Sequence, residues 1–336
     1  MLILRRCFVS SQSLVTFVMR YSLFGLMAGM VSACAPALRP AGPPVAQTVL
    51  SETAFQASDG SELPLQSWGD LEEPDAVILA LHGMGDYANA FMEFGDQVGP
   101  TGIAVYAFDQ RGFGRTSSRP FWAGAASMVN DASDALALLR ARYPDKPIYL
   151  MGNSMGGAVA IVTAATRPHL MDGVILVAPA VWNRDMMPWY QTAPLSILSH
   201  SLPWLPLSGQ GLDIWPSDNI DMLRRLARDR YMMSAVRIDL VDGVADLMDL
   251  ANKRASDMTV RTLLLSGVQD QVIPPDAVAA LDAELAGLAL PGYHRCLYET
   301  GYHMLLRDLN GPAVIDDIRR WVTQSDTAEN YSCGGS

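Results

Sequence analysis

A serine between two glycines is the clearest site for nucleophilic chemistry in the chain. The stretch "YLMGNSMGGAVAIV", residues 149–162, places Ser154 between Gly152 and Gly156, after one apolar run and before another with helical spacing. On a sharp strand-to-helix turn a serine adopts a strained backbone conformation, and the flanking glycines avoid steric clashes. The turn also brings the hydroxyl to a helix N-terminus, whose partial positive charge favours a developing oxyanion. The pattern predicts that Ser154 is a nucleophile.

A serine nucleophile needs a base, normally a histidine that a carboxylate holds in one tautomer. After a serine on such a turn, the acid and then the histidine follow along the chain. His303, in "YETGYHMLLRD", lies between the last predicted strand and the last predicted helix, so its loop can reach over the sheet to Ser154. His169 lies in a helix-to-strand loop, His200 in a long insertion, and His294 at the start of a strand. We therefore predict that His303 is the base.

Asp270 is the predicted acid of this set. It follows the penultimate predicted strand, in "LLLSGVQDQVIPP", and so lies at the carboxyl end of the sheet. Asp276 comes directly after two prolines and is typical of a first helical turn, where a carboxylate satisfies the helix dipole. Glu299 is too close to His303 along the chain for the usual geometry.

Two backbone N–H groups are predicted to form an oxyanion hole. The first belongs to Met155, the residue after the nucleophile. The second is expected in the loop "LALHGMGDYA", where glycines let the backbone approach a substrate, and Met84 is the best placed residue. His82 in this loop is predicted to make structural hydrogen bonds rather than to act on the substrate.

The motifs "HGMGD", "FDQRGFGRTS", "GNSMGGAVA", "SGVQDQVIPP" and "GYHMLLRD" together resemble the monoacylglycerol lipase and lysophospholipase branch of the α/β-hydrolases. They cover about Thr53 to Val322 in the order of that family. The resemblance implies the same triad and hole residues, and a cap that shapes an acyl pocket. Asp109 and Arg111 are expected to hold a turn. Relatives of this fold that act on haloalkanes or epoxides carry an aspartate where this chain has Ser154, so those reactions are disfavoured.

The reaction expected from these residues is hydrolysis of a carboxylic ester of a single-chain lipid, a monoacylglycerol or a lysophospholipid, through an acyl-enzyme. This chemistry requires no metal and no cofactor, and none is predicted. A short-chain carboxylesterase, a thioesterase, a peptidase or an acyltransferase with the same acyl-enzyme stays open, because fold alone does not decide among these activities. A binding protein without catalysis is a further alternative that the filled catalytic positions disfavour.

The elements that must position these residues alternate along the chain. Residues 53–68 predict a β-hairpin around Asp59-Gly60. Short apolar, β-branched runs predict strands at 77–81, 103–108, 148–151, 174–177, 262–265 and 296–298. Helical spacing predicts helices at 127–142, 155–166, 275–288 and 305–322. Such an alternation indicates an α/β fold with a mostly parallel sheet that helices cover on both faces.

The alternation stops between about 181 and 257, a segment rich in Trp and Met that shows only short helical patterns. We predict that this insertion forms a helical cap over the end of the sheet. The cap belongs to a hydrolase domain predicted at 51–325, and residues 326–336 are predicted as a C-terminal tail.

The first 33 residues predict a signal peptide, with three arginines, no acidic residue, and the apolar stretch "LFGLMAGMV". The following "VSAC" resembles a bacterial lipobox, which predicts that Cys34 carries a lipid. Residues 34–50 are then predicted to form a flexible tether. The lipid would anchor the protein in the bacterial cell envelope, at the outer membrane and facing the periplasm. An ordinary secretory signal, giving a soluble secreted or periplasmic protein, is the alternative. The sequence does not choose between Met1 and Met19 as the start.

The net charge and the cysteines bear on the binding partners of the protein and on its disulfide bonds. The formal net charge of -11 disfavours nucleic acid as a partner. Cys296 and Cys333 would lie in a compartment that permits disulfides, but the sequence leaves open whether they pair. The oligomeric state is also left open.

Overall fold

The computed structural model describes residues 35–209, 211, 213–324 and 331–334. The predicted signal peptide and Cys34 lie outside these ranges. Within them, no helix has the length and apolar character needed to cross a membrane.

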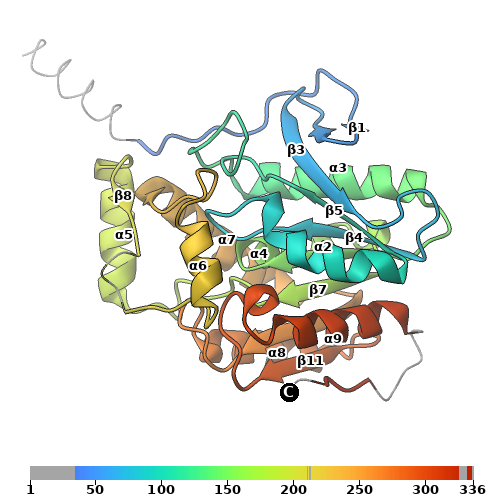
Figure 1. Ribbon diagram of the computed structural model, residues 1–336. Coiled ribbons are helices and arrows are strands. Elements are labelled where there is room, and N and C mark those ends of the chain that lie inside the picture. The colour runs from blue at the N-terminus through green and yellow to red at the C-terminus, as the bar shows by residue number, and fades with distance from the viewer. Residues whose placement is uncertain (1–34, 210, 212, 325–330, 335–336) are drawn as a thin grey trace, which may run out of the picture.

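A nine-stranded sheet forms the centre of the described residues, in the order β1-β2-β3-β5-β4-β6-β7-β10-β11 (Figure 1). The strands from β5 to β11 are parallel, whereas β1, β2 and β3 join the edge antiparallel. This is the predicted α/β-hydrolase class of sheet, and the predicted hairpin is the β2–β3 pair. The bounds are β1 (Val49–Leu50), β2 (Ala54–Gln56), β3 (Glu62–Trp68), β4 (Ala76–Leu81), β5 (Ile103–Phe108), β6 (Ile148–Asn153), β7 (Gly173–Val177), β10 (Arg261–Gly267) and β11 (His294–Tyr298).

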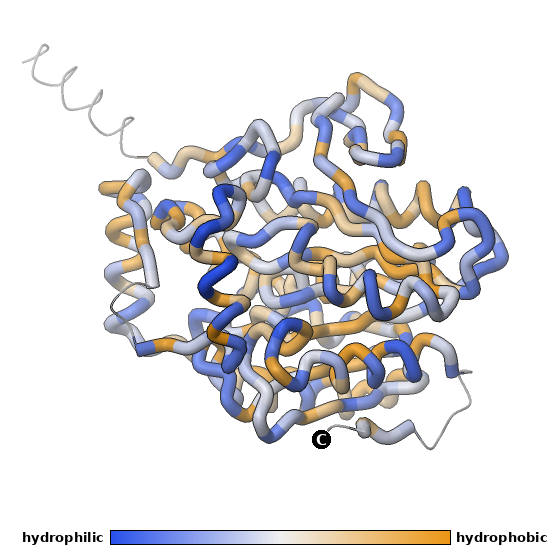
Figure 2. Tube along the Cα trace, viewed as in Figure 1, coloured by the Kyte–Doolittle hydropathy of each residue, from blue (hydrophilic) through white to orange (hydrophobic). Residues whose placement is uncertain are grey.

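Helices cover both faces of this sheet, as its two-sided apolar strands require. One face carries α3 (Ala125–Arg142), α4 (Met155–Thr166), α7 (Ile238–Ala255) and α8 (Pro275–Gly287), and the other carries α2 (Met92–Val98) and α9 (Gly311–Thr323). Figure 2 shows hydrophobic residues gathered in the central strands, while the covering helices alternate between hydrophobic and hydrophilic residues. Short 3-10 turns are η1 (Ala88–Phe91), η2 (Gly99–Thr101), η3 (Pro168–Leu170) and η4 (Leu305–Arg307).

The register of the parallel strands brings the loops after them to one edge of the sheet. Leu81 at the end of β4 lies opposite Gly152 of β6, and Gly267 at the end of β10 lies opposite Tyr298 of β11. The loops after these four strands therefore start close together, although they are far apart in the sequence.

The insertion after β7 forms the expected cap, with α5 (Trp189–Ser201), β8 (Pro206–Leu207), α6 (Ile220–Leu226) and β9 (Val236–Arg237). The prediction that residues 181–257 contain only short helical segments is wrong for their last part, because α7 has 18 residues. Leu240, Val244, Leu247 and Ala251 recur at helical spacing and are buried, and the helix packs against α4. The structure therefore places α7 in the helical layer of the sheet as well as beneath the cap.

The predicted last helix over 305–322 is also wrong in its first part. The structure has the 3-10 turn η4 there, then an extended Asp308, and α9 begins only at Gly311. Pro312 explains the break, since proline lacks an N–H and fits the first turn of a helix but not its interior.

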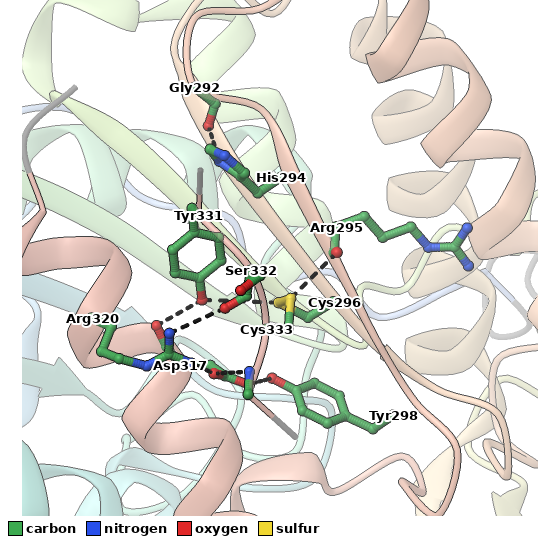
Figure 3. The surroundings of a disulfide bond; sticks show 11 residues. Gly292, His294, Arg295, Cys296, Tyr298, Asp317, Arg320, Tyr331, Ser332 and Cys333 are labelled. Carbon is green, nitrogen blue, oxygen red and sulfur yellow. Dashed lines mark hydrogen bonds and ion pairs between the residues drawn. A yellow bond between two sulfur atoms is a disulfide. The ribbon is translucent and has the colours of Figure 1, made fainter. Parts of the chain in front are cut away.

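Cys296 and Cys333 form a disulfide, which settles the question that the sequence left open. Their Cα atoms are 5.6 Å apart, and the bond ties the chain after α9 to β11 at the edge of the sheet (Figure 3). The Tyr331 hydroxyl donates to the Asp317 carbonyl at 2.9 Å, and the Gly334 N–H donates to the Asp317 carboxylate at 2.8 Å. Residues 331–334 thus pack on the hydrolase domain.

Candidate active site

Ser154 has the strained backbone expected of a nucleophile on a strand-to-helix turn, with φ 52° and ψ -117°. It stands between β6 and α4, and its N–H donates to the Val177 carbonyl at 3.0 Å. A Cβ on Gly156 would lie 2.1 Å from the Leu81 carbonyl oxygen, and one on Gly152 would lie 2.2 Å from the Gly156 carbonyl oxygen. Both positions therefore require glycine if the turn is to close.

Ser154, His303 and Asp270 form a continuous hydrogen-bonded chain. His303 Nδ1 lies 2.8 Å from Asp270 Oδ2, and His303 Nε2 lies 2.9 Å from Ser154 Oγ. Because an ionised carboxylate only accepts hydrogen bonds, the proton of a neutral His303 sits on Nδ1 and leaves Nε2 free to accept from the serine. The other carboxylate oxygen of Asp270 accepts from the N–H groups of Val272 and Ile273 at 2.8 and 2.9 Å, which fixes its orientation.

The other acids and histidines considered from the sequence lie elsewhere. Asp276 is exposed in the first turn of α8, and Glu299 is exposed after β11. His169 lies in η3, His200 near the end of α5, and His294 on β11, where its ring packs edge-on against Tyr331. None of these side chains is hydrogen-bonded to Ser154, His303 or Asp270 in the described part of the chain.

Met84 and Met155, the predicted oxyanion-hole residues, both lie beside Ser154 in the wall of one cavity. The loop before Met84 approaches the serine so closely that a Cβ on Gly83 would lie 3.2 Å from the Ser154 Cβ. Across the described ranges, no hydrogen-bond acceptor is found for the backbone N–H of Met84 or of Met155. Two backbone donors without a partner in these ranges, on residues that line the same cavity as Ser154, are the kind of groups that a developing oxyanion needs.

His82 holds the loop that carries Met84. Its Nε2 accepts from the Gln110 N–H at 2.9 Å, so the ring proton is on Nδ1, which donates to the Gly83 carbonyl at 2.8 Å. Complete burial lowers the pKa of His82 and keeps the ring neutral, although the hydrogen bond to Gly83 opposes this shift. The geometry agrees with the structural role predicted for this residue.

A buried ion pair joins the same loop to the loop of His303, and sequence reasoning missed it. Arg307 in η4 donates to Asp86, which follows Gly85. The side chains are only 10% and 6% exposed. Both residues stand inside motifs that the sequence analysis quoted, but their pairing depends on the meeting of two loops more than two hundred residues apart.

Asp308 connects the loop of His303 to the cap. Its carboxylate accepts from the Tyr302 N–H at 2.7 Å and from the Ser217 hydroxyl of the cap at 2.6 Å. Burial raises the pKa of Asp308, and these hydrogen bonds oppose that shift. The cap is therefore connected directly to the loop of the candidate base.

Asp109 and Arg111 hold turns, as predicted. Asp109 accepts from the N–H groups of Ala88 and Arg115 at 3.0 and 2.8 Å. Arg111 pairs with Asp59 at 2.8 Å and with Asp131 at 2.6 Å. These contacts stabilise the loop after β5 and the hairpin near it.

An apolar cavity of about 450 Å³ opens at Ser154, between the sheet edge and the cap. This volume is within the range of small-molecule sites. Among the described residues that line it there is no Asp, Glu, Lys or Arg, and Gln191 and Ser154 carry its polar side-chain oxygens. The apolar lining residues come from the start of α4, from α5, β8 and α7, and from three loops: Met84, Met155, Ala180, Trp182, Met187, Pro194, Leu195, Leu198, Leu207, Ile238, Val241, Val244, Ala245, Met248, Val272 and Ile273.

Comparison with known proteins supports the fold and the family. The chain is 25% identical to "Monoacylglycerol lipase" of Mycolicibacterium smegmatis, over 81% of this chain and 96% of that protein, and 26% identical to the human "Monoglyceride lipase", over 80% and 88%. Among solved structures, a Paleococcus ferrophilus monoacylglycerol lipase matches with a TM-score of 0.64 and 27% identity, over 78% of this chain and 98% of that one. Residues 72–310 match the model of the family described as "Serine aminopeptidase, S33". The chain therefore belongs to this family, and it has the α/β-hydrolase fold.

Proposed function

We propose that this chain, a carboxylic ester hydrolase, cleaves esters of single-chain lipids through an acyl-enzyme on Ser154. The observation that carries the proposal is the hydrogen-bonded chain Asp270–His303–Ser154, which ends in an apolar cavity. An apolar cavity binds an acyl chain, and the serine at its wall can reach the ester carbonyl. The relatives named as monoacylglycerol lipases support the same substrate class.

The proposed reaction begins when His303 Nε2 takes the proton of Ser154 Oγ, which attacks the ester carbonyl carbon. The N–H groups of Met84 and Met155 stabilise the negative oxygen that forms, and Asp270 stabilises the charged imidazole. His303 then gives its proton to the alcohol oxygen, the ester C–O bond breaks, and the alcohol leaves. Water, deprotonated by His303, attacks the acyl-enzyme, and Ser154 regains its proton as the fatty acid leaves.

The lining of the cavity favours a neutral lipid. A lysophospholipid carries a phosphate, which cationic side chains recognise, and an aminopeptidase substrate carries a protonated amine, which carboxylates recognise. The described lining offers neither kind of side chain. We therefore propose monoacylglycerol as the preferred substrate within this class.

We also propose that the enzyme is a lipoprotein of the bacterial cell envelope, cut before Cys34 and lipidated there. The support is the "VSAC" stretch after an apolar, arginine-bearing leader. Mass spectrometry of the mature protein tests this proposal: we expect an acylated cysteine as the first residue. An unmodified Cys34, or a mature chain that starts elsewhere, would contradict it.

Ser154→Ala tests the catalytic assignment. We expect loss of labelling by a fluorophosphonate probe and a fall in turnover of a dissolved p-nitrophenyl ester by about 10⁴-fold or more. Ser51→Ala, which changes an exposed serine before β2, is the matched control and should behave like the wild type. If Ser154→Ala kept near-normal turnover, the assignment would be wrong.

A substrate panel tests the rest of the proposal. Monoacylglycerols, lysophosphatidylcholine, short esters and thioesters of matched acyl chains are compared by kcat/KM, and product analysis with added glycerol distinguishes hydrolysis from acyl transfer. We expect monoacylglycerols to be the best substrates and free fatty acid to be the main product. Faster turnover of lysophosphatidylcholine would contradict the argument from the uncharged lining.

A further inference from the structure

The backbone on either side of His303 is held by hydrogen bonds to other segments. His303 itself lies in the loop between β11 and η4, so neither a helix nor a strand fixes it. The Tyr302 N–H donates to the Asp308 carboxylate at 2.7 Å. The Met304 N–H donates at 2.9 Å to the carbonyl of Pro216, a residue of the cap. The position of the candidate base therefore depends on both contacts, and one of them comes directly from the cap.

Ser217, the next residue of the cap, fixes the other contact. Its hydroxyl donates to one oxygen of the Asp308 carboxylate at 2.6 Å, while the second oxygen accepts from the Tyr302 N–H. Ser217 is completely buried, and Asp308 is 5% exposed. Hydrogen bonds to a charged group are strong, and they are stronger in a buried environment than in water. The serine therefore sets the orientation of the carboxylate that holds Tyr302.

The neighbours of Ser217 contact the same loop further along. The Asn219 side chain donates to the Arg307 carbonyl at 3.0 Å, and the Leu309 N–H donates to the Asp218 carboxylate at 2.8 Å. We name residues 215–219 the cap strap. Figure 1 shows α6, which begins directly after the cap strap, beside the loop that leads into α9.

The cap strap also reaches the loop of the candidate acid. The Trp215 N–H donates at 2.8 Å to the side-chain oxygen of Gln271, the residue after Asp270. The strap therefore contacts the loops of both residues that act on Ser154. None of its residues lines the cavity at the serine. Its contacts are thus suited to alignment of the site rather than to substrate binding.

We propose that Ser217 and Asp308 are positioning residues for His303, and that the cap strap aligns this base with Ser154. The cap then completes the catalytic machinery as well as covering it. The proposal rests on the proposed function, because it takes His303 as the base. A misplacement of about 1 Å in a catalytic group costs on the order of 10²-fold in rate. Loss of the Ser217 hydroxyl should therefore slow the reaction without weakening the binding of substrate.

The first experiment measures kcat and KM of Ser217→Ala with dissolved p-nitrophenyl acetate. We expect kcat to fall by about 10- to 100-fold, because the freed Asp308 carboxylate no longer holds the loop of His303 in one position. KM should stay within about twofold of the wild-type value, since the cavity is unchanged. An unchanged kcat in folded Ser217→Ala would overturn the proposal, and so would a loss that appears only in KM.

Ser199→Ala is the matched control. Ser199 is also a completely buried serine of the cap, and its hydroxyl donates to the Asp242 carboxylate at 2.8 Å. It contacts neither catalytic loop through a hydrogen bond in the described part of the chain. We expect Ser199→Ala and Ser217→Ala to unfold at similarly lowered urea concentrations, but kcat of Ser199→Ala should stay within about twofold of the wild type. Equal losses of kcat in the two variants would indicate a loosened cap and overturn the proposal.

Asp308→Asn separates the position of this side chain from its charge. The asparagine oxygen can accept from the Tyr302 N–H, and its amide N–H can donate to the Ser217 hydroxyl, so both contacts are kept. We expect kcat within about threefold of the wild type, a test that holds even if Ser217→Ala does not fold. A loss as large as that expected for Ser217→Ala would show that the charge matters rather than the position, and would overturn the proposal.

Failure of the proposed function gives a different result. In that case Ser154→Ala would keep its turnover in the same assay, and the positioning role would be wrong as well. An inactive Ser154→Ala together with a fully active Ser217→Ala would contradict the positioning role alone.

Discussion

Replacement of Arg307 by methionine tests whether the buried ion pair with Asp86 organises the active site. The methionine keeps much of the apolar stem but removes the guanidinium. Asp86 is then left 6% exposed and without its ionic partner, with a hydrogen bond of 2.9 Å from the Tyr87 N–H as a remaining contact. Removal of one partner of a buried pair typically lowers the free energy of unfolding by about 3–5 kcal/mol. We expect a loss in this range for Arg307→Met.

Asp86→Asn/Arg307→Met distinguishes the lost pair from lost packing. An asparagine oxygen can still accept from the Tyr87 N–H, and the double variant contains no unpaired charge at this place. We therefore expect it to regain at least about 2 kcal/mol relative to Arg307→Met, a coupling typical of residues in direct contact. Urea unfolding with linear extrapolation gives the free energies for the wild type, both single variants and the double variant.

The ion pair also joins the loop of Met84 to the loop of His303, so its loss should affect the reaction. A shift of about 1 Å in a catalytic group costs on the order of 10²-fold in rate. We expect Arg307→Met to lower kcat for a dissolved ester by about that factor, measured well below its unfolding transition. Free energies that add without coupling in the double variant, or an unchanged kcat in Arg307→Met, would refute the reasoning.

Three further predictions follow from single contacts. Gly156→Ala should destabilise the fold by about 3 kcal/mol in urea unfolding and reduce fluorophosphonate labelling, because its Cβ would lie 2.1 Å from the Leu81 carbonyl oxygen. Cys333→Ser should cost about 4 kcal/mol, since the disulfide closes a loop of 37 residues, while labelling of Ser154 is unchanged. Burial lowers the pKa of His82, so at low pH the unfolded chain binds a proton that the folded chain does not. The free energy of unfolding should therefore fall as the pH drops below about 6.5, by up to about 1.4 kcal/mol per pH unit. His82→Asn should flatten this slope in unfolding curves measured at about pH 5–8.

The sequence predicts best those parts of the fold that depend on residues close together along the chain, such as a turn or a continuous apolar run. The helix predicted over 155–166 has these same bounds in the structure, because its start is set by the turn at Ser154 and its apolar run is buried on all sides. The parallel strands were recognisable because burial on both faces requires continuous apolar runs. The expected spatial meeting of Ser154, Asp270 and His303 follows from the rule that the carboxyl ends of parallel strands share one edge.

The features that the sequence could not predict depend on contacts between distant segments. Asp86 and Arg307 each resemble an ordinary loop charge, and their partnership appears only when the two loops meet. The pairing of Cys296 with Cys333 likewise depends on the path of the chain after α9, which no periodicity reveals. The break before α9 was predictable in principle from Pro312, but the apolar spacing from Leu305 onward concealed it.

Helix α7 explains why substrate selectivity is the hardest property to infer from the sequence of this chain. Val244 and Met248 belong to the packed layer against the sheet and also line the cavity beside Ser154. A change of volume at either position must therefore alter core packing and the shape of the acyl pocket together. Substitutions that adjust chain-length preference are restricted to those that the core tolerates. The outer side of α5 has no such restriction, because its exposed side chains, such as Trp189 and Ile197, do not line the cavity.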